Sequence, residues 1–151
     1  MVLSIEVPDG YAYVLFTCGM LPSITNILLG GKVMAARKKF NVPLPNLYAT
    51  PGHHKEADSF NRVQRGHQHV LETISDFRAA SFIGALKHPL VCAVSGVFYC
   101  VGNYMYLVGY ADQSLDVKSA RLKKGGALQF LANVVQIGCG ISACYSLLKQ
   151  Q

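Results

Sequence analysis

The chain has 151 residues, of which 51% are hydrophobic and only 15% are charged. This length fits one domain, and the composition excludes an intrinsically disordered chain, which requires low hydrophobicity and many charges. The net charge of +6 comes from basic clusters without interleaved aromatic residues, so we expect no nucleic-acid partner.

Three stretches of the sequence carry no charged residue, and each is long enough to cross a membrane. They cover residues 11–31, 89–111 and 125–148. A helix rises 1.5 Å per residue, so about 20 apolar residues cross the ~30 Å hydrocarbon layer. A buried helix of a soluble protein explains one such run but not three together. The first run follows acidic residues instead of a basic segment, so we interpret it as a retained span and not as a signal peptide.

A further helix is predicted between the first two of these runs, although it contains charges. Its ionisable residues recur at steps of 3, 4, 3 and 4, which places them on one stripe of a helix. They are Arg62, Arg65, His69, Glu72 and Asp76. In a soluble protein such a stripe faces water, whereas among membrane spans it faces the bundle interior or a wet cleft and usually marks function.

These elements predict an all-α fold, a four-helix transmembrane bundle formed by a single domain over residues 1–151. The approximate spans are 10–38, 58–87, 88–112 and 125–148. The connection between the first two contains three prolines and a glycine that block helix continuation, and Asp58 is expected to cap the second helix.

Basic residues indicate the orientation of the bundle. Eleven of the fourteen lysines and arginines lie in or beside the loops that join the first helix to the second and the third to the fourth. By the positive-inside rule, both loops are cytosolic and both termini are lumenal. The location expected is an intracellular membrane, the endoplasmic reticulum or alternatively the outer mitochondrial membrane.

The five cysteines predict neither a disulfide framework nor a metal site. All fall inside the expected spans, with no CxxC pair and no Cys–His spacing. The loop pair His53-His54 is interpreted as a solvated turn, so we expect no metal.

A tyrosine-rich stripe on the third helix suggests a binding site at the cytosolic end. Its members are Tyr99, Asn103, Tyr106 and Tyr110, at steps of 4, 3 and 4. Alternatively, these tyrosines lie at the membrane–water interface, where tyrosine is common. For Tyr110 taken alone, this explanation is as good as a role in ligand binding. Combined with nearby arginines, His69 and Glu72, the tyrosines suit an anionic, peptide-like ligand with two carboxylates and one ammonium group.

The residues 60–72, FNRVQRGHQHVLE, resemble the second-helix signature of the membrane-associated proteins in eicosanoid and glutathione metabolism, the MAPEG family. The resemblance is closest to its microsomal glutathione transferase type 3 branch. Segments 35–40 and 106–110 fall where that branch has similar sequences, and the resemblance extends over about residues 10–148.

The resemblance implies a homotrimer that binds glutathione as a co-substrate between neighbouring subunits near the cytosolic side. It implies conjugation of glutathione to lipophilic electrophiles and glutathione-dependent reduction of lipid hydroperoxides. The glutathione-binding residues implied are Arg37, Lys38, Arg65, His67, His69, Glu72, Tyr106 and Tyr110.

Departures from the family pattern bear on catalysis. His69 stands where the family usually has asparagine, and Thr73 replaces a common tyrosine. The family's thiol-activating arginine has two candidate matches here, Lys118 and Arg121, with Tyr110 as a further candidate donor to the sulfur. If no cation reaches the sulfur, the alternative is a non-catalytic lipid-binding or scaffold protein on the same fold.

Overall fold

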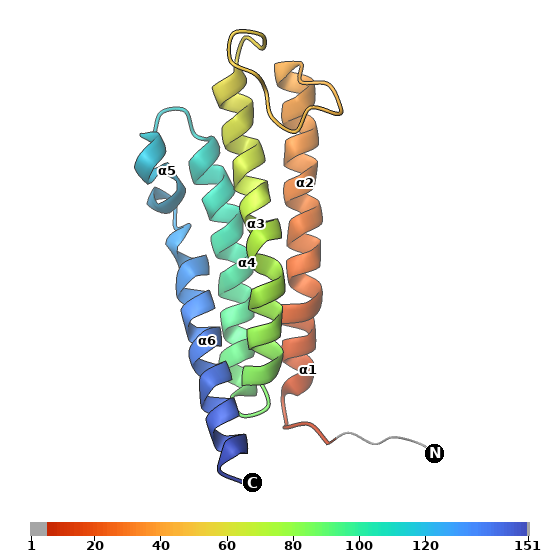
Figure 1. Cartoon of the computed structure of the whole chain (residues 1–151), viewed down its shortest axis with the longest axis vertical. Coiled ribbons are helices and arrows are strands. Elements are labelled where there is room, and N and C mark those ends of the chain that lie inside the picture. Colours follow the sequence, from red (N-terminus) through yellow and green to blue (C-terminus); the bar gives the residue numbers. More distant parts are fainter. Residues whose placement is uncertain (1–5, 151) are drawn as a thin grey trace, which may run out of the picture.

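The computed structural model describes residues 6–150, and throughout this range the secondary structure is helical, with no strand (Figure 1). One continuous helix covers residues 11–40. It consists of α1 (Tyr11–Val14), a π-helical segment (Leu15–Met20) and α2 (Leu21–Phe40). It is followed by α3 (Ala57–Gly84), α4 (Pro89–Ala111), α5 (Val117–Lys123) and α6 (Ala127–Leu148).

Three of these helices, Tyr11–Phe40, Pro89–Ala111 and Ala127–Leu148, are long and apolar enough to cross a membrane. Their outward-facing side chains include Ile27 and Val134, which are 73% and 67% exposed. A water-soluble monomer rarely exposes apolar surface of this extent. The exposed apolar side chains and the three apolar helices therefore indicate an integral membrane protein. The all-α prediction is confirmed for the described residues.

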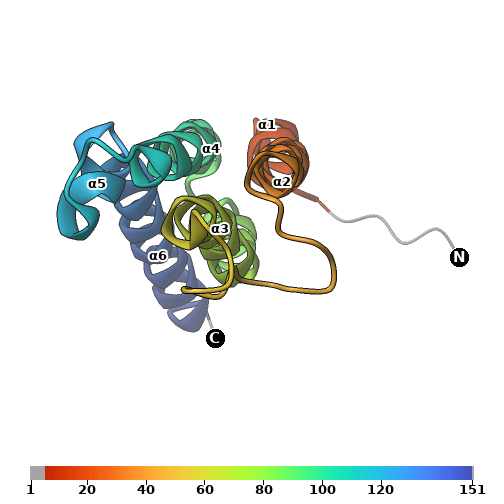
Figure 2. The same cartoon turned by 90° about the horizontal axis from the view of Figure 1, so that it is seen from above.

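The long helices run side by side, and α3 lies in the middle, in contact with α2, α4 and α6 (Figure 2). Its inner face carries Phe77, which stacks on Tyr99 of α4 with ring centroids 3.8 Å apart. The loop over residues 41–56 and helix α5 occupy one end of the bundle. The beginning of α1 and the end of α6 occupy the other end (Figure 1).

Two glycines allow α6 to approach its neighbours closely. A Cβ on Gly84 of α3 would lie 2.7 Å from Cys139 Cβ, and a Cβ on Gly102 of α4 would collide with the backbone nitrogen of Gln129. Small residues at such contacts let helix backbones pack tightly in membranes, where van der Waals contact replaces hydrophobic driving force.

The structure differs from the sequence prediction in helix number and in helix ends. The short helix α5 lies in the segment that was expected to be a loop, so four helices is an incomplete count. Helix α3 begins at Ala57 after Glu56, so the prediction that Asp58 caps this helix was wrong. Asp58 instead lies in the first turn, where a negative charge favours the helix dipole.

Arg78 of α3 binds the π-helical segment and the start of α2. Its Nη2 donates to the Gly19 carbonyl at 2.8 Å and also to Ser23 Oγ. A π-bulge widens the helix and disturbs its regular hydrogen bonds. Arg78 thereby links α3 to the helix over residues 11–40 in an otherwise apolar part of the bundle.

Candidate functional site

An ion pair on the outer side of α3 forms the centre of the candidate site. Arg65 Nη1 lies 2.7 Å from Glu72 Oε1, and the two side chains are 40% and 44% exposed. Gln68, which lies between them on the helix, also donates to Glu72 Oε1 at 3.2 Å. Exposed ion pairs contribute little net stability, so these charges can exchange partners at small cost.

His69 joins this ion pair to α4 and α6. Its ring stacks on Tyr106, with centroids 4.3 Å apart and planes 14° apart. The Gln129 amide Nε2 donates to His69 Nε2 at 2.8 Å, which assigns the ring proton to Nδ1. Phe130 completes the aromatic surroundings, with its centroid 5.6 Å from that of His69. We call Arg65, Gln68, His69 and Glu72 of α3, together with Tyr106 of α4, the α3 polar face.

Arg62, the first member of the predicted stripe, does not belong to this face. It is only 5% exposed, and its Nε and Nη2 donate to the carbonyls of Tyr110 and Leu115 at 2.6 and 3.1 Å. Its guanidinium also lies 5.8 Å from the centroid of the Tyr110 ring. Arg62 therefore binds the carbonyl of Tyr110, in the last turn of α4, and that of Leu115, in the segment between α4 and α5. Its charge also complements the helix dipole at the C-terminus of α4.

The two candidate thiol-activating cations lie on α5. Lys118 and Arg121 are both exposed and are three residues apart, on one side of this short helix. The backbone of Arg121 lies close to Tyr106, and Gly126 packs between them. Gly126 permits this arrangement, because a Cβ there would collide with the Arg121 carbonyl and lie 2.8 Å from the Tyr106 Cα.

Three predicted binding residues lie on a different side of the chain. His67 points toward α2, where its Nε2 lies 2.9 Å from Asn26 Oδ1. Arg37 donates to the Asn46 carbonyl at 2.7 Å, and with Lys38 it lines a surface cavity of about 460 Å³ at the end of α2. On an α-helix, His67 is about 200° from Arg65, so the two side chains point to nearly opposite sides of α3.

The predicted residues thus divide into two groups. Arg65, His69, Glu72 and Tyr106 come together, with Tyr110 and Arg121 nearby, whereas Arg37, Lys38 and His67 occupy the α2 side. Asp76 is exposed on α3, and Lys118 is exposed on α5. The α3 polar face offers a cation, a carboxylate and an aromatic surface, which suits a ligand carrying both an ammonium group and a carboxylate.

Sequence reasoning missed the contribution of α6. Gln129 is fully buried, and Asn133, one turn later, donates to both its carbonyl and its Oε1. The available signal was a pair of polar residues four positions apart in an otherwise apolar helix. Such pairs in a membrane span are usually satisfied internally.

The sequence matches a protein-family model over most of its length. The model of the MAPEG family matches residues 14–142, which include the three apolar helices almost entirely and the whole of the α3 polar face. This family includes glutathione transferases and peroxidases. Because the match covers most of the sequence, the chain belongs to the MAPEG family.

Proposed function

We propose that this chain is a membrane-bound glutathione transferase that conjugates glutathione to lipophilic electrophiles and reduces lipid hydroperoxides. The observation that carries the proposal is the Arg65–Glu72 ion pair beside the His69–Tyr106 stack, in a chain of the MAPEG family. Among the branches of the family, the type 3 glutathione transferases remain the proposed relatives.

The charges of the ion pair match those of glutathione, which carries two carboxylates and one ammonium group. When glutathione binds, a carboxylate can replace Glu72 beside Arg65, and the ammonium can replace Arg65 beside Glu72. Both exchanged interactions are charge-assisted hydrogen bonds, and Arg65 can accept a carboxylate in a bidentate fork.

Activation of the thiol requires a cation near the sulfur, because only the thiolate is an effective nucleophile at neutral pH. Arg121 is the favoured candidate, since its backbone lies beside Tyr106 of the α3 polar face, with Gly126 between them. In conjugation, the thiolate sulfur forms a bond to an electrophilic carbon, and the leaving group departs with the electron pair of the bond that breaks, as chloride does from 1-chloro-2,4-dinitrobenzene. In the peroxidase reaction, two glutathione molecules are oxidised to their disulfide while the hydroperoxide is reduced to an alcohol and water.

The division of the predicted residues supports a site shared between copies. Arg37, Lys38 and His67 lie on the α2 side, away from the α3 polar face of their own chain. A second copy, packed with its α2 side against α3, would bring these residues to the ligand. This arrangement agrees with the proposed homotrimer, which would also cover Asp76.

The membrane proposed is that of the endoplasmic reticulum, with the basic loops cytosolic and the termini lumenal. The loop over residues 41–56 and α5 lie at the same end of the bundle (Figure 1), and Arg65, Gln68 and His69 lie in the half of α3 that begins at that end. Glutathione is abundant in the cytosol, so this orientation gives the site access to its co-substrate.

A non-catalytic lipid-binding or scaffold protein is the alternative. The observation that favours it is the exposure of both candidate cations, Lys118 and Arg121, on a helix of only seven residues. A mobile or distant cation would leave glutathione bound but its thiol inactive.

A conjugation assay on the purified protein in mild detergent tests the proposal. It uses 1-chloro-2,4-dinitrobenzene as the electrophile and, separately, cumene hydroperoxide with coupled detection of oxidised glutathione. We expect turnover in both assays and its loss in Arg65→Ala. Absence of turnover in the wild type, with glutathione binding retained, would favour the non-catalytic alternative.

A further inference from the structure

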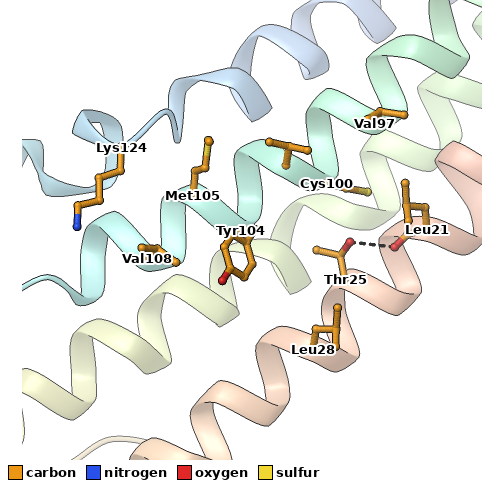
Figure 3. A pocket seen from close by; sticks show the side chains of 10 residues that line it. Leu21, Thr25, Leu28, Val97, Cys100, Tyr104, Met105, Val108 and Lys124 are labelled. Atoms are coloured by element: carbon orange, nitrogen blue, oxygen red, sulfur yellow. Dashed lines mark hydrogen bonds between the residues drawn. The ribbon is translucent and has the colours of Figure 1, made fainter.

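An apolar groove lies between α2 and α4, and none of its lining residues belongs to α3. In Figure 2 the ribbons of α2 and α4 lie next to each other, with α3 below them. It has a volume of about 500 Å³, and its lining includes Leu21, Leu28, Val97, Val101, Val108 and Lys124. The hydroxyl of Thr25, which also faces it, is already engaged with the Leu21 carbonyl at 3.0 Å. The walls are therefore apolar along most of their length, and Lys124 stands at one end (Figure 3).

The groove continues toward the end of α4 into a second cavity of about 370 Å³. The two cavities share Val108 and Lys124, and the second adds Lys32 and Asp112. The Lys32 ammonium lies 5.0 Å from the centroid of the Tyr104 ring, and Tyr104 lines the first cavity. Two lysines therefore stand at the same mouth of a long apolar groove.

The mouth keeps a net positive charge despite Asp112. Lys124 Nζ lies 2.6 Å from Asp112 Oδ2, and Ser114 donates to Asp112 Oδ1 through both its backbone nitrogen and its hydroxyl. These partners hold the pKa of Asp112 well below its usual range, so it stays ionised and neutralises one lysine. The charge of the second lysine remains, and Lys124 is 45% exposed with further N–H groups to donate.

We propose that this groove binds one anionic membrane phospholipid, with an acyl chain between α2 and α4 and its phosphate at Lys32 and Lys124. From Leu21 to Lys32 the apolar wall extends about 16 Å along α2, which accommodates much of one chain within a single leaflet. Basic residues at the headgroup level attract anionic lipids. The site lies apart from the α3 polar face and is independent of glutathione chemistry.

A second groove in the same protein has no charged lining residue and serves as a comparison. It lies between α4 and α6, has a volume of about 440 Å³ and is lined by Val94, Phe98 and Leu131 among others, with no charged residue in its lining. Both grooves offer apolar walls to acyl chains. Only the α2–α4 groove combines those walls with basic residues, so selectivity for anionic headgroups is expected there alone.

Native mass spectrometry of the purified protein tests the proposal, with phosphatidylglycerol and phosphatidylcholine of identical chains as probes. We expect one phosphatidylglycerol to be retained at activation energies that remove phosphatidylcholine. Lys32→Gln and Lys124→Gln are each expected to lower this preference roughly five-fold, which corresponds to about 1 kcal/mol per basic residue near an anionic lipid. Lys124→Arg should retain it, as should Lys123→Gln, a substitution of the neighbouring lysine outside the groove.

Filling the groove gives an independent measurement. Val101→Trp should displace the retained lipid, whereas Val94→Trp in the α4–α6 groove should leave it bound, provided both variants keep the wild-type thermal unfolding temperature in detergent. Equal retention of both phospholipids, or a preference unaffected by Lys32→Gln and Lys124→Gln, would overturn the proposal. Disulfide cross-linking of Val101→Cys between copies would also overturn it, because the groove would then be covered by a second chain.

Discussion

Arg65 and Glu72 form an ion pair across two turns of α3, with 2.7 Å between Arg65 Nη1 and Glu72 Oε1. Their Cα atoms are about 10.5 Å apart along the helix axis, so both side chains must extend toward each other to meet. The pair therefore keeps two opposite charges half-exposed and accessible to a zwitterionic ligand.

Loss of either charge should weaken glutathione binding without unfolding the protein. We expect Arg65→Ala and Glu72→Gln each to raise the dissociation constant roughly ten- to hundred-fold, the range for a lost hydrogen bond to a charged group. Isothermal titration calorimetry in detergent measures this dissociation constant. Asp76→Asn, which changes a carboxylate one turn further along α3, is the control and should bind as the wild type does. Unchanged affinity in both site variants would place the ligand elsewhere.

Arg62 should matter for stability more than its neighbour Arg65. Arg62→Met removes two hydrogen bonds, to the carbonyl of Tyr110 in α4 and to that of Leu115 in the segment after it, from a site that is only 5% exposed. The expected loss in unfolding free energy is about 2–4 kcal/mol, because hydrogen bonds to charged groups contribute about 1.5–3 kcal/mol each and are not additive. Thermal unfolding in detergent should show this loss for Arg62→Met and little change for Arg65→Met. The reverse order would contradict the structural role of Arg62.

Helix packing can be tested at two glycines that differ in their surroundings. A Cβ at Gly102 collides with the backbone of Gln129, whereas a Cβ at Gly138 meets nothing within 4 Å. Gly102→Ala should destabilise the protein by about 1–3 kcal/mol through overpacking, and Gly138→Ala should be neutral or stabilising, as is usual for alanine in a helix. Differential scanning fluorimetry compares the two. Equal stability would mean that α6 does not approach α4 this closely.

Much of the fold could be predicted because charges are expensive in a membrane. Charge-free runs therefore indicate the apolar helices, and the stripe from Arg65 to Asp76 indicates the polar side of α3. Helix α5 was missed because Val117–Lys123 is short and carries three basic residues, which is also typical of a loop. Nothing in its hydrophobic periodicity separates the two.

The candidate site could be predicted only in part. The spacing places Arg62 with Arg65, yet the partners of Arg62 are the backbone carbonyls of Tyr110 and Leu115, which no side-chain pattern reveals. Likewise, the contact between Gln129 and His69 joins residues 60 positions apart and depends on how α6 packs against α3. Tertiary packing decides both contacts.

The orientation in the membrane should follow the basic loops. In sealed vesicles with the cytosolic side outward, single cysteines introduced at His53 and Lys149, in a variant from which the native cysteines are removed, should label differently. We expect a membrane-impermeant maleimide to modify position 53 and spare position 149, because eleven of the fourteen basic residues lie at the end of the bundle that includes position 53. Labelling at 149 alone would reverse the topology.

The most direct test of the proposed chemistry is the pH at which protein-bound glutathione becomes a thiolate. Stopped-flow ultraviolet absorbance measures thiolate formation on mixing glutathione with the purified protein at a series of pH values. A cation beside the sulfur lowers the thiol pKa, so the thiolate band should appear at or below neutral pH in the wild type. Arg121→Met should raise the pH of its appearance by about 1–3 while binding persists, and Lys118→Met should change it little. A wild-type protein that binds glutathione yet shows no thiolate below pH ~8.5, the ordinary pKa of a free thiol, would contradict the account.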